Sequence, residues 1–149
     1  MAKHTAPLLV AILSILLTAT RATLTKAPVP APAAKPTAYE MLGRYGFPPG
    51  ILPQGVHDYE LRPDGSFEVH FTDECKLRID GYDIHYSTRV AGNIKNDTIS
   101  GLEGIKVKVF IAWISIEDVG RDGNELRLHT RVISKSFSVD VFSSSPKCN

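Results

Sequence analysis

The stretch HDYELRPDGSFEVHF, residues 57–71, decides the fold, because two segments of alternating apolar and polar side chains flank one turn signal. In Arg62–Gly65, proline suits the first central turn position, aspartate the next, and glycine the left-handed position of a three-residue hairpin loop. This register sets Arg62 opposite Ser66. The facing pairs on the apolar side are Leu61 with Phe67, Tyr59 with Val69 and His57 with Phe71. We therefore predict an antiparallel hairpin here.

A second hairpin is predicted around Asp80–Gly81, a dipeptide typical of a two-residue turn. The strand residues on one face then pair as Cys75 with Tyr86, Leu77 with Ile84 and Ile79 with Tyr82. Further along, Gly92 interrupts the alternation and predicts a bulge or a sharp bend in a curved sheet.

The later strands are predicted from side-chain alternation alone. Residues 105–119 read as one long strand, whose second half, VFIAWISI (residues 109–116), is apolar on both faces. Residues 125–132 and 136–142 alternate again. With about seven or eight strands joined mostly by short turns, the sequence predicts a mainly β domain, a small antiparallel β-barrel with one short N-terminal helix.

That helix precedes the first strand. Thr37 and Glu40 have the spacing of a capping box, which predicts a helix over residues 38–45. The stretch GFPPGILPQGV, residues 46–56, follows, and its prolines and glycines oppose regular structure. Two interpretations stay open for it. It is either a structural joint that docks the helix on the sheet or a clamp on a ligand.

Residues 1–22 have the pattern of a secretory signal peptide. Lys3 precedes an apolar run over residues 8–19, which is short for a membrane span, and small residues follow at the positions required for cleavage. We therefore expect a secreted, extracellular protein. The alternative is an uncleaved anchor, which Arg21 at the end of the run keeps open.

Residues 23–36 are rich in proline and alanine and predict a semi-rigid linker. The β-barrel domain is then predicted over residues 37–149. Removal of residues 1–22 takes away Lys3 and Arg21 and no acidic residue, so the formal charge falls from +1 to 1 − 2 = −1. Such a near-neutral chain has neither the basic surface that nucleic acids require nor a polybasic stripe for anionic lipid, and we expect no nucleic acid partner.

The chain has two cysteines, Cys75 and Cys148. An even count in an oxidising compartment favours one disulfide, which would pin the C-terminus to the sheet. Two separate thiols are the alternative. A glycosylation sequon begins at Asn96, between two predicted strands, so Asn96 is a candidate glycosylation site.

Motifs for catalysis are absent from the sequence. It has no G-x-S-x-G elbow, no closely spaced zinc ligands and no phosphate-binding glycine loop, so we expect no metal and no cofactor. The predicted register places His70 opposite Asp58 on the polar face. This is typical of a solvated cross-strand pair, with a catalytic dyad as the alternative. The catalytic residues of any enzyme activity stay unknown.

The run over residues 109–116 holds more apolar side chains than one buried face can accept. If Val109, Ile111 and Trp113 face the core, the alternate side chains need a second cover, which we expect the N-terminal helix to supply. Incomplete cover would leave a groove for an apolar ligand. Its candidate lining residues are Tyr39, Leu42, Phe110, Ala112, Trp113 and Ile114.

A series of motifs extends over the whole predicted domain. They are GFPPGILPQGV, GSFEVHF, Cys75, Tyr82 and Tyr86, ISGLEGIKVK, Trp113, SFSVDVF and the closing SSPKC. Their order and spacing resemble the plant domain-of-unknown-function 538 (DUF538) family over residues 37–149. The resemblance implies a small β-barrel, often behind a signal peptide, without established catalytic residues. Binding of lipid-like molecules and hydrolysis of a pigment ester are activities proposed for that family.

We expect a secreted, non-catalytic binding or interaction domain whose ligand is an apolar or lipid-like small molecule. Two alternatives stay open. One is an ester hydrolase, with Ser87, Ser100 and Ser115 as candidate nucleophiles near a histidine. The other is a structural extracellular protein with a filled core, an exposed apolar patch and an unknown protein partner.

Overall fold

The structure is a computed structural model that describes residues 34–149. Within it, Pro36–Asn149 form one compact unit. The predicted signal peptide and residues 23–33 of the predicted linker lie outside the described residues. No helix within residues 34–149 is long and apolar enough to cross a membrane.

The chain is mainly β, with one α-helix and two short 3-10 helices in the described range. The helical elements are α2 (Ala38–Arg44), η2 (Pro49–Ile51) and η3 (Val139–Phe142). The strands are β1 (Val56–Leu61), β2 (Ser66–Phe71), β3 (Cys75–Ile79), β4 (Tyr82–Lys95), β5 (Thr98–Val109), β6 (Ala112–Asp122), β7 (Glu125–Thr130) and β8 (Ser134–Ser138).

The eight strands form one sheet in the order β1-β2-β4-β5-β6-β7-β8, and β3 pairs with β4 beside this path. Every pairing is antiparallel. The long strand β4 holds two neighbours on the same side, because β3 pairs with its first residues and β2 with its later ones. β1 and β8 are the ends of the path, and no pairing described here joins them. Closure into a barrel is therefore not shown.

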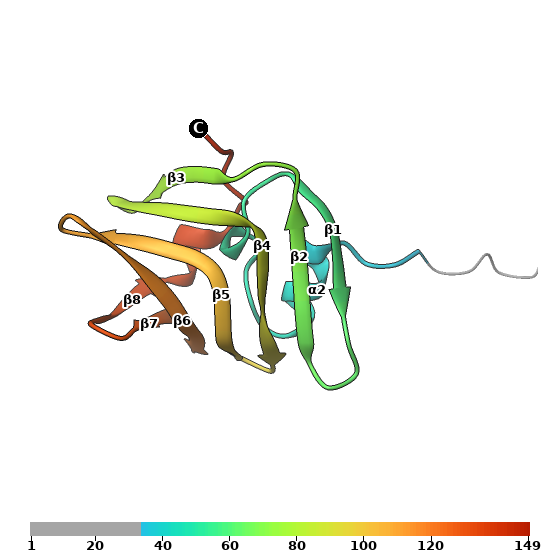
Figure 1. Cartoon of the computed structure of the whole chain (residues 1–149). Coiled ribbons are helices and arrows are strands. Elements are labelled where there is room, and N and C mark those ends of the chain that lie inside the picture. The colour runs from blue at the N-terminus through green and yellow to red at the C-terminus, as the bar shows by residue number, and fades with distance from the viewer. Residues whose placement is uncertain (1–33) are drawn as a thin grey trace, which may run out of the picture. The chain divides into compact units, whose positions relative to one another are not determined.

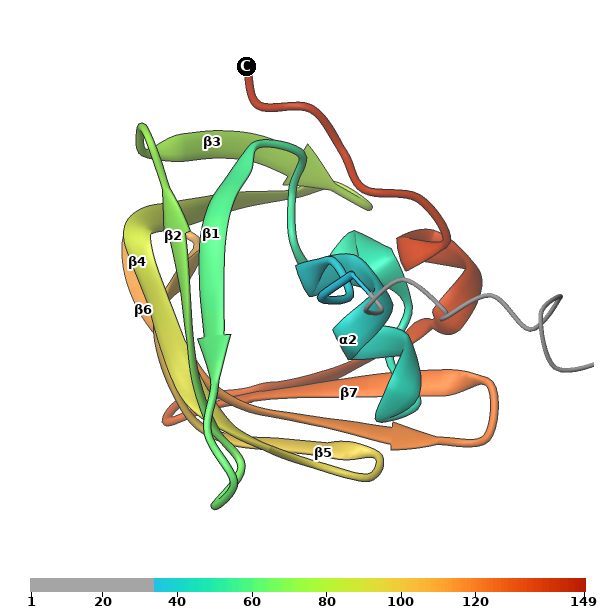
Figure 2. The ribbon, with the colours of Figure 1, turned by 90° about the vertical axis from the view of Figure 1, so that its right-hand side faces the viewer.

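The sheet is strongly curved. Figure 2 shows β3 above, β1, β2 and β4 at the side and β5 and β7 below, with α2 on the concave side. The helix and both 3-10 helices add buried side chains to the core on this side, among them Leu42, Ile51 and Phe142. The apolar faces of the strands thus curve around these helical segments.

The two hairpins with turn signals are confirmed. β1 and β2 pair Leu61 with Phe67 and Tyr59 with Val69, and β3 and β4 pair in the predicted register. One predicted pair is wrong. A bulge between Val56 and Asp58 sets Val56, not His57, opposite Phe71, and leaves His57 exposed. The predicted irregularity at Gly92 is also present, as a shift of the β4–β5 register beside it.

The prediction of one long strand over residues 105–119 is wrong. The chain reverses at Phe110 and Ile111, so that Val109 of β5 pairs with Ala112 of β6 (Figure 1). Phe110 adopts a φ of +57°, a conformation that bulky residues rarely take. This turn contains no glycine, asparagine or aspartate, the residues that usually mark a two-residue turn. Alternation of side chains alone therefore did not predict it.

The last predicted strand ends early. β8 stops at Ser138, and Val139–Phe142 form the 3-10 helix η3 instead of continuing the alternation. The Ser138 hydroxyl accepts a hydrogen bond from the Asp140 amide at 3.3 Å, which caps this turn. At the other end of the domain, the predicted capping box between Thr37 and Glu40 is present and starts α2.

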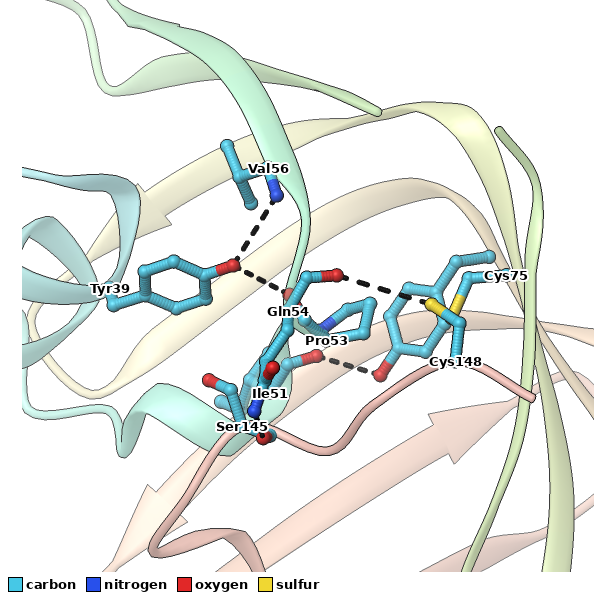
Figure 3. Close-up of a disulfide and its surroundings, with 9 residues drawn as sticks. Tyr39, Ile51, Pro53, Gln54, Val56, Cys75, Ser145 and Cys148 are labelled. Carbon is cyan, nitrogen blue, oxygen red and sulfur yellow. Dashed lines mark hydrogen bonds between the residues drawn. A yellow bond between two sulfur atoms is a disulfide. The ribbon is translucent and has the colours of Figure 1, made fainter. Parts of the chain in front are cut away.

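Residues 46–56, here called the connector, join α2 to β1 with only the single 3-10 turn η2. Three connector carbonyl oxygens accept hydrogen bonds from hydroxyls elsewhere in the domain: Pro49 from Ser145 at 2.9 Å, Ile51 from Tyr86 at 2.8 Å and Pro53 from Tyr39 at 2.7 Å. Figure 3 shows the Tyr39 hydroxyl directed at Pro53. The connector is therefore a structural joint between α2, β4 and the C-terminal tail.

The C-terminal tail, residues 143–149, completes this joint. The Gln54 amide donates to Pro146 at 2.8 Å, and the Asn149 amide donates to Lys76 of β3 at 2.9 Å. The predicted disulfide between Cys75 and Cys148 is present, with a Cα–Cα separation of 5.2 Å (Figure 3). It links β3 to the tail and closes the loop between two positions 73 residues apart.

We predict that Gly50→Ala destabilises the domain by about 1–3 kcal/mol. A Cβ at Gly50 would lie 2.4 Å from the carbonyl oxygen and 2.7 Å from the Cα of Phe142, and backbone cannot move aside as a side chain can. Gly43→Ala is the matched control. Its Cβ meets nothing within 4 Å, and alanine in a helix should stabilise by about 0.5–1 kcal/mol. Urea unfolding measures both, and equal stabilities for the two variants would contradict the close packing of η2 on η3.

We also predict that the Cys75→Ala and Cys148→Ala double variant loses about 2–5 kcal/mol of unfolding free energy, because the open chain gains conformational entropy in the unfolded state. Denaturation in urea gives the value. Reduced wild type serves as the control, because it loses the covalent link and keeps the buried Cys75 side chain. Reduction without any change in the urea midpoint would show that the tail contributes nothing through its disulfide.

Candidate functional site

An apolar cavity of about 60 Å³ lies in the core on the concave side of the sheet. Its lining residues come from most of the strands and from η2 and η3: Ile51, Ile79, Tyr82, Ile84, Tyr86, Leu102, Ile105, Val107, Ile116, Val119, Leu126, Leu128, Thr130, Ile133, Lys135, Phe137 and Phe142. The connector contributes a single side chain to this wall, Ile51. Nearly all of the lining is hydrocarbon, as in sites for apolar ligands.

One wall of the cavity is a row of aromatic side chains. The rings of Tyr82 and Phe137 meet edge to face with centroids 5.8 Å apart, and those of Phe137 and Phe142 do so at 5.9 Å. Phe142 is buried beside the connector, whereas Tyr82 lies near the β3–β4 turn. The row therefore leads from the buried end of the cavity toward the hairpin turns.

Lys135 is the one charged residue in the cavity lining, and it is exposed. Its Nζ lies 5.2 Å from the centroid of the Tyr82 ring, within the range of a cation–π contact. Hydrogen bonding to Tyr82 raises the pKa of the Lys135 amine above its ordinary value, so Lys135 is a cation at neutral pH. Together with the exposed Ile133, it marks the side on which the cavity lining reaches the surface.

The structure does not bring together the six residues predicted to line a ligand groove. Tyr39 and Leu42 lie in α2, whereas Phe110, Ala112, Trp113 and Ile114 belong to the β5–β6 hairpin. Figure 1 places the tip of that hairpin at the far end of the sheet from α2. None of the six lines the cavity. The reversal at Phe110 is the physical reason, because it turns the supposed second apolar face into an exposed turn.

Tyr86 is the most deeply buried titratable side chain near the cavity. Burial raises the pKa of its phenol well above the ordinary value, and its hydroxyl donates to the Ile51 carbonyl. A phenol that stays protonated and already donates to backbone cannot act as a base. Its contribution is structural, because it satisfies a carbonyl in a segment without ladder partners.

A serine–histidine pair lies on the β7–β8 hairpin. His129 Nδ1 and the Ser134 hydroxyl are 2.7 Å apart across the ladder, and Asp118 of β6 faces His129 from the other side. A shallow surface depression is lined in part by Asp118 and His129. Sequence reasoning missed this pair, because residues 125–132 were read as one strand and the turn between Thr130 and Ser134 carries no glycine, proline, asparagine or aspartate.

The other candidate catalytic residues are placed differently. Ser87, Ser100 and Ser115 have no histidine as a hydrogen-bond partner among the contacts described for residues 34–149. His70 stands opposite Asp58, as predicted from the hairpin register. Within the same residues, no three His, Cys, Asp or Glu side chains lie close enough together to hold a metal ion.

The predicted glycosylation site, Asn96, is exposed in the turn between β4 and β5. The next residue fixes this turn on the end of the helical segment, because the Asp97 amide donates to the Tyr45 carbonyl at 2.8 Å. The Asn96 side chain is thus on the surface of an anchored turn.

Fold and cavity together define a class of small antiparallel β domain with a helix-covered concave face and an apolar interior. The model of the family described as "Protein of unknown function, DUF538" matches residues 38–143, and the chain belongs to this family. The chain is also similar to "Uncharacterized protein At5g01610" of Arabidopsis thaliana. The two are 28% identical over 105 residues, which cover 69% of this chain and 61% of the relative.

Proposed function

We propose that this domain binds an apolar, lipid-like small molecule, with the hydrocarbon part in the cavity and a polar head near Lys135. The observation that carries the proposal is a hydrocarbon-lined cavity whose lining reaches the surface at an exposed ammonium. Apolar walls with one polar group at the entrance suit an amphiphile, because the chain leaves water while the head stays hydrated.

The cavity as described is small for a whole ligand. Its 60 Å³ correspond to room for about four to six water molecules, whereas ligand sites usually span about 300–1,000 Å³. Uptake of a lipid chain therefore requires the cavity to widen. The wall that can yield is β8, because it is an edge strand paired only with β7, and most of its residues are exposed.

The proposed setting is the secretory pathway, through cleavage of the predicted signal peptide and glycosylation at Asn96. The disulfide supports this setting, because such bonds persist in oxidising compartments. The exposed position of Asn96 supports the glycan, because a sugar there would meet no packed side chains.

We expect a fluorescent fatty acid to bind the domain and Val119→Phe to weaken this binding about tenfold or more, because a larger ring in the cavity wall competes with the ligand for the same volume. Val119 is buried and lines the cavity, whereas Val141 is exposed on η3 and is absent from the lining. Val141→Phe is therefore the matched control and should bind like wild type. Fluorescence titration measures both.

The same titration tests the head group. Lys135→Met should weaken binding of the fatty acid and leave binding of its uncharged methyl ester unchanged, because only the carboxylate meets the ammonium.

A milder substitution, Val119→Leu, covers the case in which Val119→Phe fails to fold. Equal affinity of wild type and both folded Val119 variants would place the ligand elsewhere.

A second candidate function, hydrolysis of an ester, is favoured by the contact between His129 and Ser134. Such a dyad can deprotonate the hydroxyl for attack on an ester carbonyl and return the proton to the leaving alcohol. Asp118 is the ladder neighbour of His129 on β6, but no hydrogen bond or ion pair described for residues 34–149 joins the two side chains. The pair lies on an exposed sheet edge with only a shallow depression beside it, so the binding function is supported better.

The hydrolase candidate predicts turnover of p-nitrophenyl acetate that falls roughly 10²-fold or more in Ser134→Ala, because the nucleophile is lost. Ser100→Ala is the control, because Ser100 is also exposed and has no histidine contact among those described. Absorbance of the released phenol gives both rates. Identical rates in the two variants would show that the contact between His129 and Ser134 is a surface hydrogen bond without a catalytic role.

A further inference from the structure

The β5–β6 turn breaks two rules that folded domains usually obey. Phe110 and Ile111 are 93% and 92% exposed, although both are large and apolar. Phe110 also adopts a φ of +57°, where glycine or asparagine would be less strained. Packing does not explain either residue, because neither contributes to the core. An exposed apolar turn in a rarely adopted backbone conformation has the features expected of a contact surface.

This turn is one part of a larger apolar surface. Antiparallel order places the β3–β4, β5–β6 and β7–β8 turns at the same end of the sheet, as Figure 1 shows. Nearly all the exposed large apolar side chains of residues 34–149 lie on the last two of these hairpins. They are Phe110, Ile111, Trp113, Val132 and Ile133, and we call them the tip face.

Cationic side chains flank the tip face on the two hairpins that form it. Lys108 lies 6.0 Å from the centroid of the Trp113 ring, and Arg131 and Lys135 belong to the β7–β8 hairpin. At the β3–β4 turn, Arg78 and Asp83 form an ion pair at 3.7 Å, which leaves Asp80 as the acidic side chain of that turn. The sequence alone shows no polybasic stripe, because these cations come from different hairpins.

We infer that the tip face docks on a lipid bilayer that carries anionic headgroups, with Phe110 and Ile111 in the apolar layer and Lys108 and Arg131 at the headgroups. The inference rests on the exposed side chains and their charges and does not require a ligand in the cavity. Docking of the tip face would also explain why the cavity lining reaches the surface at this end of the sheet. Ile79, Ile133 and Lys135 belong both to this end of the sheet and to that lining, so a docked domain would present the cavity to the lipid.

Three features favour a bilayer over a protein partner. Phe110 and Ile111 project from a turn, and a fluid apolar layer accepts such a projection without a matching pocket. Trp113, which stands behind the tip beside Lys108, has the amphipathic ring that prefers the membrane–water interface. The surrounding cations match anionic headgroups, and each adds attraction near the membrane surface.

The first test uses the full chain with vesicles of phosphatidylcholine alone and of phosphatidylcholine mixed with phosphatidylserine. Trp113 is the only tryptophan of the chain, so its emission reports on the tip face and not on the apolar residues 8–19. We expect a blue shift with the mixed vesicles and quenching by brominated lipid. Unchanged Trp113 emission with both kinds of vesicle would overturn the inference.

The second test measures cosedimentation of a double variant, Phe110→Gly with Ile111→Asn. Binding to mixed vesicles should fall about tenfold or more, because the two largest exposed apolar groups are lost. Stability in urea should stay equal or rise, because glycine relieves the positive φ. Val141→Asn is the control, since Val141 is 39% exposed outside the tip face, and it should bind like wild type.

The third test addresses charge. Lys108→Gln with Arg131→Gln should remove the preference for phosphatidylserine, and added salt should act in the same way on wild type.

Unimpaired binding by the Phe110 and Ile111 double variant would assign the contact to another segment, and a loss of stability would make the turn a folding element. Conversion of a wild-type oligomer to a monomer by that variant, without vesicle binding, would identify the tip face as a protein interface.

Discussion

Three hydrogen bonds from hydroxyl groups to carbonyl oxygens of the connector fix this segment between α2, β4 and the C-terminal tail. Pro48, Pro49 and Pro53 remove three amide donors from this segment, which opposes a β-ladder, and its carbonyls still require partners. Tyr39, Tyr86 and Ser145 supply them from α2, β4 and the C-terminal tail. Each bond is worth about 0.5–1.5 kcal/mol. Loss of the Tyr86 hydroxyl costs more, because it would leave the buried Ile51 carbonyl without this partner. The stiff segment is thereby fixed from three directions.

This arrangement makes the two ends of the domain unequal. At the connector end, the disulfide, the tail and the close contact of Gly50 with Phe142 bind η2, η3 and β3 together. At the opposite end the hairpin turns have apolar side chains in water, and the edge strand β8 has one neighbour. Local opening should therefore concentrate at the tip end. An entrance for a ligand is best placed there, since widening at that end leaves the connector joint unchanged.

Sequence reasoning succeeded where two local signals agreed. At Pro63–Gly65 and Asp80–Gly81, turn chemistry and period-two alternation gave the same register, and the structure confirms both hairpins. It failed where only one signal was available. The turn at Phe110 carries no turn residue, and the Ser138 cap ends β8 although alternation continues. The predicted disulfide was confirmed because a cysteine count needs no register. The irregularities of the sheet were predicted only in part. Gly92 interrupts the alternation and marks the shift beside it, whereas the shift between Val56 and Asp58 carries no such signal.

The cavity could not be predicted from the sequence either, because no local signal marks it. Its lining is distributed over six of the eight strands, so no short segment carries its pattern. The six residues predicted to line a groove followed from reading residues 109–116 as one continuous strand. The observation behind that error was nevertheless sound, because this run has more apolar side chains than the core can bury. In the structure the chain reverses at Phe110, and the apolar side chains of Phe110 and Ile111 stay exposed to solvent. A strained turn with two large apolar side chains in water lowers the stability of the folded domain. Contact with an apolar environment outside the domain would make the same arrangement favourable, because the two side chains would then leave water.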